Sequence, residues 1–328
     1  MKNVYLNKAI SDATMEEMDR DESVILVGLD MMKLNGAFGI FQGCPQKYPD
    51  RCIDMPIAEL GFSHFAAGAA MAGKRPIVDL MFSDFMTLPS DSIINTAAKY
   101  RYCMLGREKM PIVYISGNGS GGLYGGWGMG CNHGNCLEML FLNVPGLKVV
   151  MPLYPEDAKG LMKAAIRDDD PVIFFWHMAT LGLRGDVPDE EYIIPLNNAA
   201  IVRKEGKDVT LVAVQGIVPF AMEAAAELEK EGIDVEVIDP RVINPLDKEK
   251  ICKSVSKTGR LVIAHEAPIT YGLGGEIASI IAYECFSDLK APIKRLGQLH
   301  TPGPVGPAEH LMQVNKDQII AAVKEIAK

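Results

Sequence analysis

The chain has 328 residues, of which 48% are apolar and 23% are charged, so it is long enough to form two domains with sizeable cores. Its 42 acidic residues outnumber its 33 basic ones, and the net charge of −9 argues against nucleic acid as a partner. The seven cysteines are odd in number and form no C-x-x-C pair, which fits neither a disulfide framework nor a zinc site of paired thiolates. Since the sequence shows no signal-peptide pattern and no apolar stretch approaching about 18 residues, we expect a cytoplasmic protein with no membrane segment.

The first half of the chain alternates short β-branched runs with helix-sized intervals, as is typical of parallel sheets with crossover helices. A helix is predicted before residue 21, where apolar residues recur on one helical face, and a first strand ends near Asp30. Further strands are predicted at 76–82, 111–116, 147–152 and 171–177. The intervening helices are predicted at 61–72, 90–101, 137–142 and 155–167.

A polar stretch with several prolines, residues 185–198, is predicted to be an interdomain linker. A second alternation follows it, with strands predicted at 208–216, 234–243, 259–267 and 291–297, and helices at 218–230, 275–287 and 318–328. The sequence therefore predicts an α/β fold with two parallel-sheet domains, residues 1–184 and 199–328.

Glycines are concentrated between residues 117 and 134, directly after a predicted strand. Gly117, Gly119 and Gly122 have the G-x-G-x-x-G spacing of a dinucleotide-binding loop. That motif must open a helix, whereas here glycines continue to residue 130, so the context argues against a dinucleotide site. A glycine loop at the carboxyl end of a parallel strand can still approach a ligand closely, and the alternative is a mobile surface loop.

Two side chains are candidates for acid–base chemistry. Glu59 is flanked by Ile57, Leu60 and Phe62, so its carboxylate should be partly desolvated and useful as an acid or base. The alternative is that it only complements the N-terminus of the following helix. His133 is expected at a loop-to-helix junction, where it could relay protons, although a single histidine without a placed partner more often makes a plain polar contact. The sequence contains no G-x-S-x-G elbow, no phosphate loop and no histidine pair with metal-ligand spacing on a helix.

Several long segments carry a family pattern along essentially the whole chain: DMPIAELGFSHFAAGAAMAGKRPIVDLMFSDFM, DSIINTAAKYRY, PGLKVVMPLYPEDAKGLMKAAIRDDDPVIFF, EVIDPRVINPLD and SVSKTGRLVIAHEA. In these segments the chain resembles the beta subunits of thiamine-diphosphate-dependent 2-oxo acid dehydrogenases, of the pyruvate and acetoin dehydrogenase type. The resemblance implies a pyrimidine-binding thiamine-diphosphate fold followed by a domain of the transketolase C-terminal type.

The resemblance also implies roles for single residues. Glu59 resembles the glutamate that hydrogen-bonds the pyrimidine ring of the cofactor and favours its imino tautomer, whose nitrogen then removes the thiazolium proton. Phe85 resembles the aromatic residue that packs on the pyrimidine, which leaves its alternative, an ordinary core phenylalanine, less favoured. Ile57 matches an apolar position beside the ring, and His133 matches a histidine near the reacting centre. The backbone of five residues matches a structural potassium site of some members: Ile112, Ala165, Ile166, Asp168 and Asp170.

The family's beta subunit acts with partners. The resemblance implies a beta dimer within an α2β2 enzyme, an alpha subunit that holds Mg²⁺ and the cofactor's diphosphate, and a lipoyl acyltransferase component that receives the acyl or aldehyde unit. This chain lacks the G-D-G motif of the magnesium and diphosphate clamp, which fits that division. Two alternatives stay open: the C-terminal half of a split transketolase-like enzyme, and a non-catalytic assembly subunit, against which the intact Glu59 and Phe85 count.

Three departures from the family pattern are expected at the active-site mouth. Leu29 stands where relatives carry an acidic residue, and Ile115 stands where many carry arginine. Gly134 and Asn135 follow the histidine where relatives read serine and glutamine. The sequence therefore does not decide between pyruvate, branched-chain 2-oxo acids, acetoin and sugar phosphates as substrate.

Overall fold

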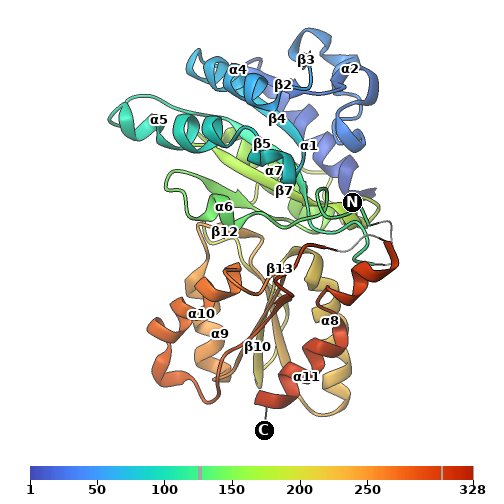
Figure 1. Ribbon diagram of the computed structural model, residues 1–328, viewed down its shortest axis with the longest axis vertical. Helices are drawn as coiled ribbons and strands as arrows, with labels where there is room; N and C mark the ends of the chain where they lie inside the picture. Colours follow the sequence, from blue (N-terminus) through green and yellow to red (C-terminus); the bar gives the residue numbers. More distant parts are fainter. Residues whose placement is uncertain (125–127, 304–305, 328) are drawn as a thin grey trace. The chain divides into compact units, whose positions relative to one another are not determined.

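The computed structural model describes residues 1–124, 128–303 and 306–327, which separate into two units (Figure 1). One unit contains residues 1–118 and 140–196, and the other contains residues 119–139 and 197–328. Among the residues described, no helix combines the length and apolarity that crossing a membrane requires.

The first unit is built on a parallel sheet with the strand order β6-β7-β5-β4-β2-β3. The bounds of these strands are β2 Val24–Gly28, β3 Cys52–Asp54, β4 Arg75–Phe82, β5 Val113–Asn118, β6 Lys148–Val150 and β7 Val172–His177. Strands β2, β5 and β7 are buried along their whole length, as expected for a parallel sheet that is covered on both faces. The strands predicted from β-branched runs are therefore confirmed.

One helix of the first unit begins at the predicted residue. Helix α7 (Pro155–Arg167) has proline in its first turn together with Glu156 and Asp157, which suits the positive end of the helix dipole. The predicted helix 90–101 is divided into a π-helical turn, η4 (Ser92–Ala97), and the helix α5 (Ala98–Cys103). The remaining helices are α1 Leu6–Arg20, α2 Met31–Leu34, α3 Cys44–Lys47, α4 Glu59–Met71 and α6 Met139–Leu142. Helix α4 begins two residues earlier and α6 two residues later than predicted, and the short helices α2 and α3 were not predicted.

The polar stretch that was predicted as a linker is partly a strand. Strand β8 (Arg184–Val187) pairs antiparallel with β1 (Lys2–Tyr5), and the N-terminal ammonium group lies 2.6 Å from the carboxylate of Asp189. The division into residues 1–184, 185–198 and 199–328 stays a prediction.

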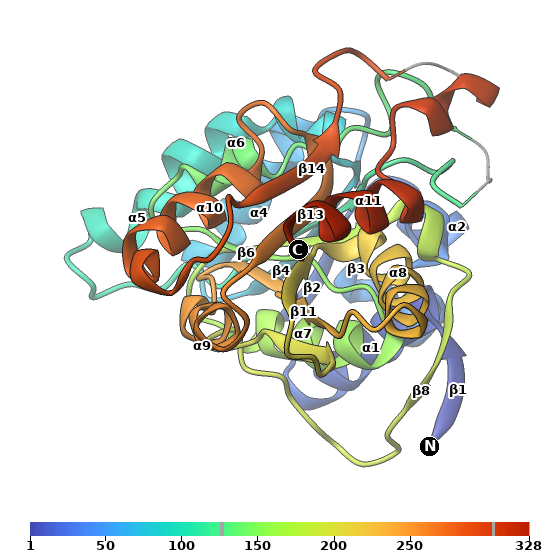
Figure 2. The same cartoon turned by 90° about the horizontal axis from the view of Figure 1, so that it is seen from below.

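The second unit has a sheet with the order β14-β13-β10-β11-β9, in which β9 alone runs antiparallel to its neighbour. Figures 1 and 2 show α9 and α10 on one face of this sheet and α8 and α11 on the other. The strands of this sheet are β9 Ile201–Lys204, β10 Val209–Ala213, β11 Val235–Asp239, β13 Leu261–Pro268 and β14 Lys294–Gln298, and the unit also contains the short strand β12 Val242–Asn244. Its helices are α8 Val218–Lys230, α9 Lys248–Thr258, α10 Leu273–Glu284 and α11 Lys316–Ile326.

Candidate cofactor site

Glu59 is a buried carboxylate at the first position of α4. Its exposed fraction is 7%, and Phe62 is buried in the same helix, while Ile57 and Leu60 are exposed. The first turn of a helix stabilises a negative charge through the helix dipole. Both sequence interpretations of Glu59, the desolvated carboxylate and the complement to the helix N-terminus, are therefore compatible with its position.

No hydrogen bond or ion pair joins the Glu59 carboxylate to another residue that the structure describes, and its oxygens are not among the fully enclosed side-chain atoms that lack a partner. Such a carboxylate can accept a hydrogen bond from a ligand without first losing a bond to the protein. A pyrimidine ring nitrogen that shares a proton with this carboxylate is such a ligand. The burial of Glu59 and the absence of a protein partner therefore fit the cofactor that the resemblance implies.

Phe85 lies near Glu59 in the sheet topology. It belongs to the short helical turn η3 (Ser83–Thr87), which follows the carboxyl end of β4, and Glu59 comes soon after the carboxyl end of β3. Strands β3 and β4 both pair in parallel with β2, so the two residues follow the same edge of one sheet, where ligands bind in α/β folds. Phe85 is half-buried and meets Phe82 edge to face, with ring centroids 5.2 Å apart.

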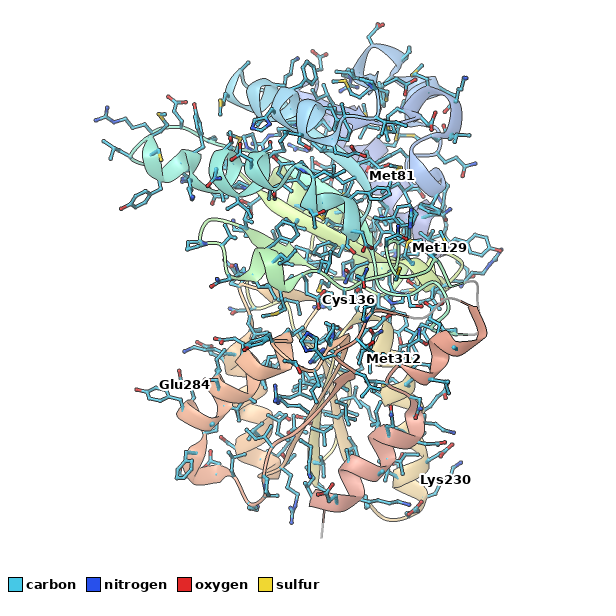
Figure 3. All side chains as sticks on the ribbon, in the orientation of Figure 1. Met81, Met129, Cys136, Lys230, Glu284 and Met312 are labelled. Carbon is cyan, nitrogen blue, oxygen red and sulfur yellow. The ribbon has the colours of Figure 1, made fainter. Side chains whose placement is uncertain are left out.

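A bulge in β4 directs the chain toward Phe85. The pairing of β4 with β5 shifts register between Asp79 and Phe82. Met81, which is labelled in Figure 3, lies within this bulge and has a positive φ of 58°. The buried Asp79 carboxylate accepts a hydrogen bond of 3.0 Å from the Met81 amide. Bulges of this kind re-aim side chains next to active sites. This bulge was not predicted, although the aspartate within the apolar run PIVDLMF was an available signal.

His133 lies in a turn of the second unit, and the helix expected after it begins later, at Met139. The Nδ1 atom of His133 lies 2.9 Å from Oδ1 of Asn132. The Asn135 side chain donates to the carbonyl of Cys131 at 2.8 Å, a local bond that competes with helix formation. The helix predicted at 137–142 is thus observed two residues later, as α6, and His133 lies in the loop that precedes it. Glu59 and Phe85 belong to one unit and His133 to the other.

The three glycines with dinucleotide-type spacing serve three local purposes. A Cβ atom on Gly117 would lie 2.7 Å from Cη2 of Trp176, and Gly119 has a positive φ of 76°. A Cβ atom on Gly122 would lie 2.9 Å from Oε2 of Glu309. No described helix begins at these glycines, which agrees with the argument against a dinucleotide site. Residues 125–127 of the predicted glycine loop lie outside the described residues.

A pair of carboxylates anchors the described start of the glycine loop within the second unit. The amide of Ser120 donates a hydrogen bond of 2.6 Å to Glu266, and the Ser120 hydroxyl donates to Glu309. Burial, and then the nearby charge of Glu266, raise the pKa of Glu309. These bonds hold Ser120 in a buried position.

Three of the residues matched to a potassium site, Ile166, Asp168 and Asp170, already interact with cationic side chains. Arg75 donates to the carbonyl oxygens of Ile166 and Asp168 at 3.1 and 2.8 Å. Lys148 Nζ lies 2.7 Å from both carboxylate oxygens of Asp168. The carbonyls of Ala165 and Ile112 accept from the amides of Asp168 and Val172, and Asp170 pairs with Arg101. Cationic side chains therefore contact oxygens of Ile166, Asp168 and Asp170, whereas the carbonyls of Ala165 and Ile112 accept from backbone amides. Potassium here stays a prediction.

The departures from the family pattern fall in different surroundings. Ile115 is fully buried within β5 and Leu29 is 8% exposed, so both have the burial of core residues. Gly134 and Asn135 lie in the second unit, beside His133.

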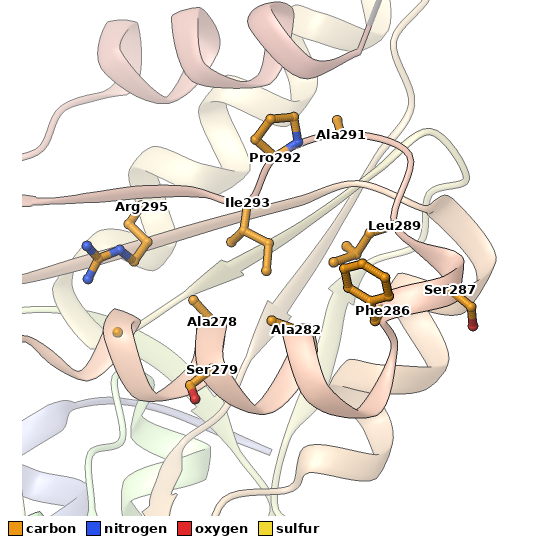
Figure 4. Close-up of a pocket in the computed structure, with 11 residues that line it drawn as sticks. Ala278, Ser279, Ala282, Phe286, Ser287, Leu289, Ala291, Pro292, Ile293 and Arg295 are labelled. Carbon is orange, nitrogen blue, oxygen red and sulfur yellow. The ribbon is translucent and has the colours of Figure 1, made fainter.

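A separate groove of about 900 Å³ in the second unit, along α10 and β14, contains none of the predicted site residues (Figure 4).

Comparisons with known proteins identify the family. The "Transketolase, pyrimidine binding domain" model matches residues 2–182, and the "Transketolase, C-terminal domain" model matches residues 198–319. The chain is 40% identical to an acetoin:2,6-dichlorophenolindophenol oxidoreductase subunit beta of Cupriavidus necator, over 100% of this chain and 98% of that protein. It is 41% identical to a 2-oxoisovalerate dehydrogenase subunit beta of Bacillus subtilis, over 98% of this chain and 97% of that protein. The chain belongs to the beta subunits of thiamine-diphosphate-dependent 2-oxo acid and acetoin dehydrogenases.

This beta-subunit family also includes a plant relative among the matches. A mitochondrial pyruvate dehydrogenase E1 component subunit beta-2 of Oryza sativa is 40% identical, over 98% of this chain and 86% of that protein. Among solved structures, a split-gene transketolase described as an inactive beta4 tetramer gives a TM-score of 0.81 at 24% identity, with 99% of this chain and 98% of that chain covered. That likeness concerns the fold alone, and it confirms the predicted two-domain α/β architecture.

Proposed function

We propose that this beta subunit acts in an α2β2 enzyme that uses thiamine diphosphate to cleave a C–C bond next to a carbonyl. The substrate is a 2-oxo acid or acetoin, and a lipoyl group receives the acyl or aldehyde unit. The full-length similarity to beta subunits, together with the buried and unpartnered carboxylate of Glu59, supports this proposal most. The cofactor supplies the carbon nucleophile for the substrate carbonyl, and the chain supplies binding, orientation and proton control.

In this proposal each residue of the site has a defined task. Glu59 shares a proton with the pyrimidine ring of the cofactor, and its burial strengthens that hydrogen bond. The half-buried ring of Phe85 offers an aromatic surface to the pyrimidine, and Ile57, which is 85% exposed, offers an apolar one. The His133 imidazole can give or take a proton at a substrate oxygen.

The partners follow from what the chain exposes and from what its sequence lacks. An alpha subunit would supply the Mg²⁺ and diphosphate ligands, because the G-D-G motif is missing from this chain. Helix α4 exposes Leu60, Phe65 and Met71 by 41% or more, which supports a contact with a second beta subunit. A cytoplasmic location is part of the proposal, supported by the seven cysteines, which are all free thiols.

The alternative within enzymes is the C-terminal half of a split transketolase-like enzyme, which the altered residues Leu29, Gly134 and Asn135 keep open. A non-catalytic assembly subunit is the alternative outside enzymes. Co-purification with the candidate alpha chain, followed by assays with pyruvate, 2-oxoisovalerate, acetoin and sugar phosphates, tests all three. We expect substrate-dependent reduction of lipoamide. Turnover with sugar-phosphate acceptors alone would favour the split transketolase-like enzyme. No turnover with any combination of substrate and acceptor would favour the non-catalytic assembly subunit.

A further inference from the structure

Four aromatic rings form a continuous chain within the first unit. The rings of Trp176 and Phe38 have centroids 5.5 Å apart, those of Phe38 and Phe82 are 5.4 Å apart, and those of Phe82 and Phe85 are 5.2 Å apart. The three interplanar angles are 66°, 90° and 76°, so each ring meets the next edge to face. This is the favoured geometry of aromatic pairs, in which the tilt of one ring constrains the tilt of its neighbour.

One end of the aromatic chain is fixed by a glycine in the central strand. Gly117 on β5 pairs with Phe82 on one side and with Trp176 on the other. A Cβ atom at Gly117 would lie 2.7 Å from the Trp176 indole, so the indole can approach β5 only because the side chain is missing. Trp176 is fully buried, and its indole N–H has no acceptor among the described residues, so ring packing rather than a hydrogen bond holds it.

Phe38 is the bridge of the chain, and its backbone is held in an unfavourable conformation. It has a positive φ of 59°, between Gly36 and Gly39, which also have positive φ. For a non-glycine residue this conformation persists only where the surroundings enforce it, and such residues cluster at functional sites. The Phe38 ring remains 39% exposed although it contacts two buried rings. A ring placed only to fill the core would be covered.

We propose that Phe38 is a positioning residue that sets the orientation of Phe85, through Phe82, and thereby the surface on which the cofactor's pyrimidine packs. This inference rests on the proposed function, because it concerns the pyrimidine ring that would pack on Phe85. The three residues belong to three separate segments: Phe38 to the loop after β2, Phe82 to the end of β4, and Phe85 to η3. Direct contacts between the rings therefore link these three segments, in addition to the backbone hydrogen bonds of the sheet.

The test uses the complex with the alpha chain and the variants Phe38→Ala, Phe38→Leu and Phe38→Tyr. We expect Phe38→Ala and Phe38→Leu to bind thiamine diphosphate about threefold to tenfold more weakly, the scale of losing an aromatic pair. Phe38→Tyr keeps the ring and should bind as the wild type does. Affinity for thiazole diphosphate, which lacks the pyrimidine, should be unchanged in all variants. Tyr283→Ala, which removes a ring that is 86% exposed in the second unit, is the control.

The outcomes separate this inference from the function on which it rests. Equal affinity of Phe38→Ala and wild type for thiamine diphosphate, or an equal loss for thiazole diphosphate, would overturn the positioning role. Failure of the wild-type complex to bind thiamine diphosphate would overturn the proposed function and this inference with it. The fluorescence of Trp176, measured without cofactor in a Trp127→Phe background, tests the aromatic chain directly. We expect Phe38→Ala to shift this emission to longer wavelength, and an unchanged spectrum would also refute the inference.

Discussion

Replacing Glu59 by glutamine tests the central claim about this site. Glutamine keeps the size of the side chain and can still hydrogen-bond, but it cannot share a proton with a pyrimidine nitrogen. Removing positioned proton-transfer chemistry costs about 10² to 10⁴ in rate, equivalent to about 2.7 to 5.5 kcal/mol in the activation free energy. If Glu59 only complemented the helix dipole at the start of α4, the change would instead lower the free energy of unfolding by about 0.3 to 1 kcal/mol and leave the rate near normal. The two explanations therefore predict changes in different quantities.

Exchange of the cofactor's thiazolium proton is the decisive measurement, because this step precedes any reaction with substrate. The assembled wild-type and Glu59→Gln enzymes would be compared by quenched-flow NMR, with urea unfolding of both as the measure of stability. We expect slow exchange and near-normal unfolding in the variant. Equal exchange rates in the two enzymes would remove Glu59 from the mechanism and would leave the non-catalytic subunit as the better explanation of the chain.

Four further predictions concern cofactor binding, assembly, packing and pH. Calorimetry of the isolated chain with magnesium should detect at most weak binding of thiamine diphosphate, and tight binding would contradict a site shared with an alpha subunit. Light scattering should find self-association at micromolar concentration, through the exposed apolar face of α4 in the small-residue segment 61–73. A monomer at that concentration would contradict this contact. Gly117→Ala should lower the free energy of unfolding by about 1 to 3 kcal/mol, because the added methyl group would lie 2.5 Å from Met178 Sδ, whereas Gly182→Ala, with no atom within 4 Å, should change it little. Burial lowers the pKa of His265 to about 4. Between about pH 6.5 and 4 the unfolded chain therefore binds a proton at this histidine and the folded chain does not, so the free energy of unfolding should fall as the pH drops through this range. His265→Gln should flatten that slope in urea titrations, and an unchanged slope would refute the assignment.

Elements with a strong apolar period could be predicted from the sequence, and polar ones could not. Helices at 155–167 and 218–230 are confirmed to the residue as α7 and α8. Helix α9 was missed because its sequence, KEKICKSVSKT, is mostly polar, and Ile251 and Val255 are the apolar side chains of its buried face. Its caps were nevertheless visible: Asp247 accepts a hydrogen bond from the Lys250 amide, and Gly259 closes the helix with a positive φ of 74°.

Some residues of the candidate site could be predicted from their neighbours in the sequence, and others only from contacts between distant segments. Glu59 and Phe85 could be named beforehand because each belongs to a run of consecutive residues that resembles a known family. Phe38 and Trp176 could not, because their importance depends on rings that meet across three strands and a loop. The glycine pattern shows why spacing alone misleads. Gly117 makes room for an indole, Gly119 allows a left-handed turn, and Gly122 accommodates a carboxylate. The G-x-G-x-x-G spacing here thus arises from three unrelated constraints, which only the backbone conformation and the surroundings of each glycine distinguish.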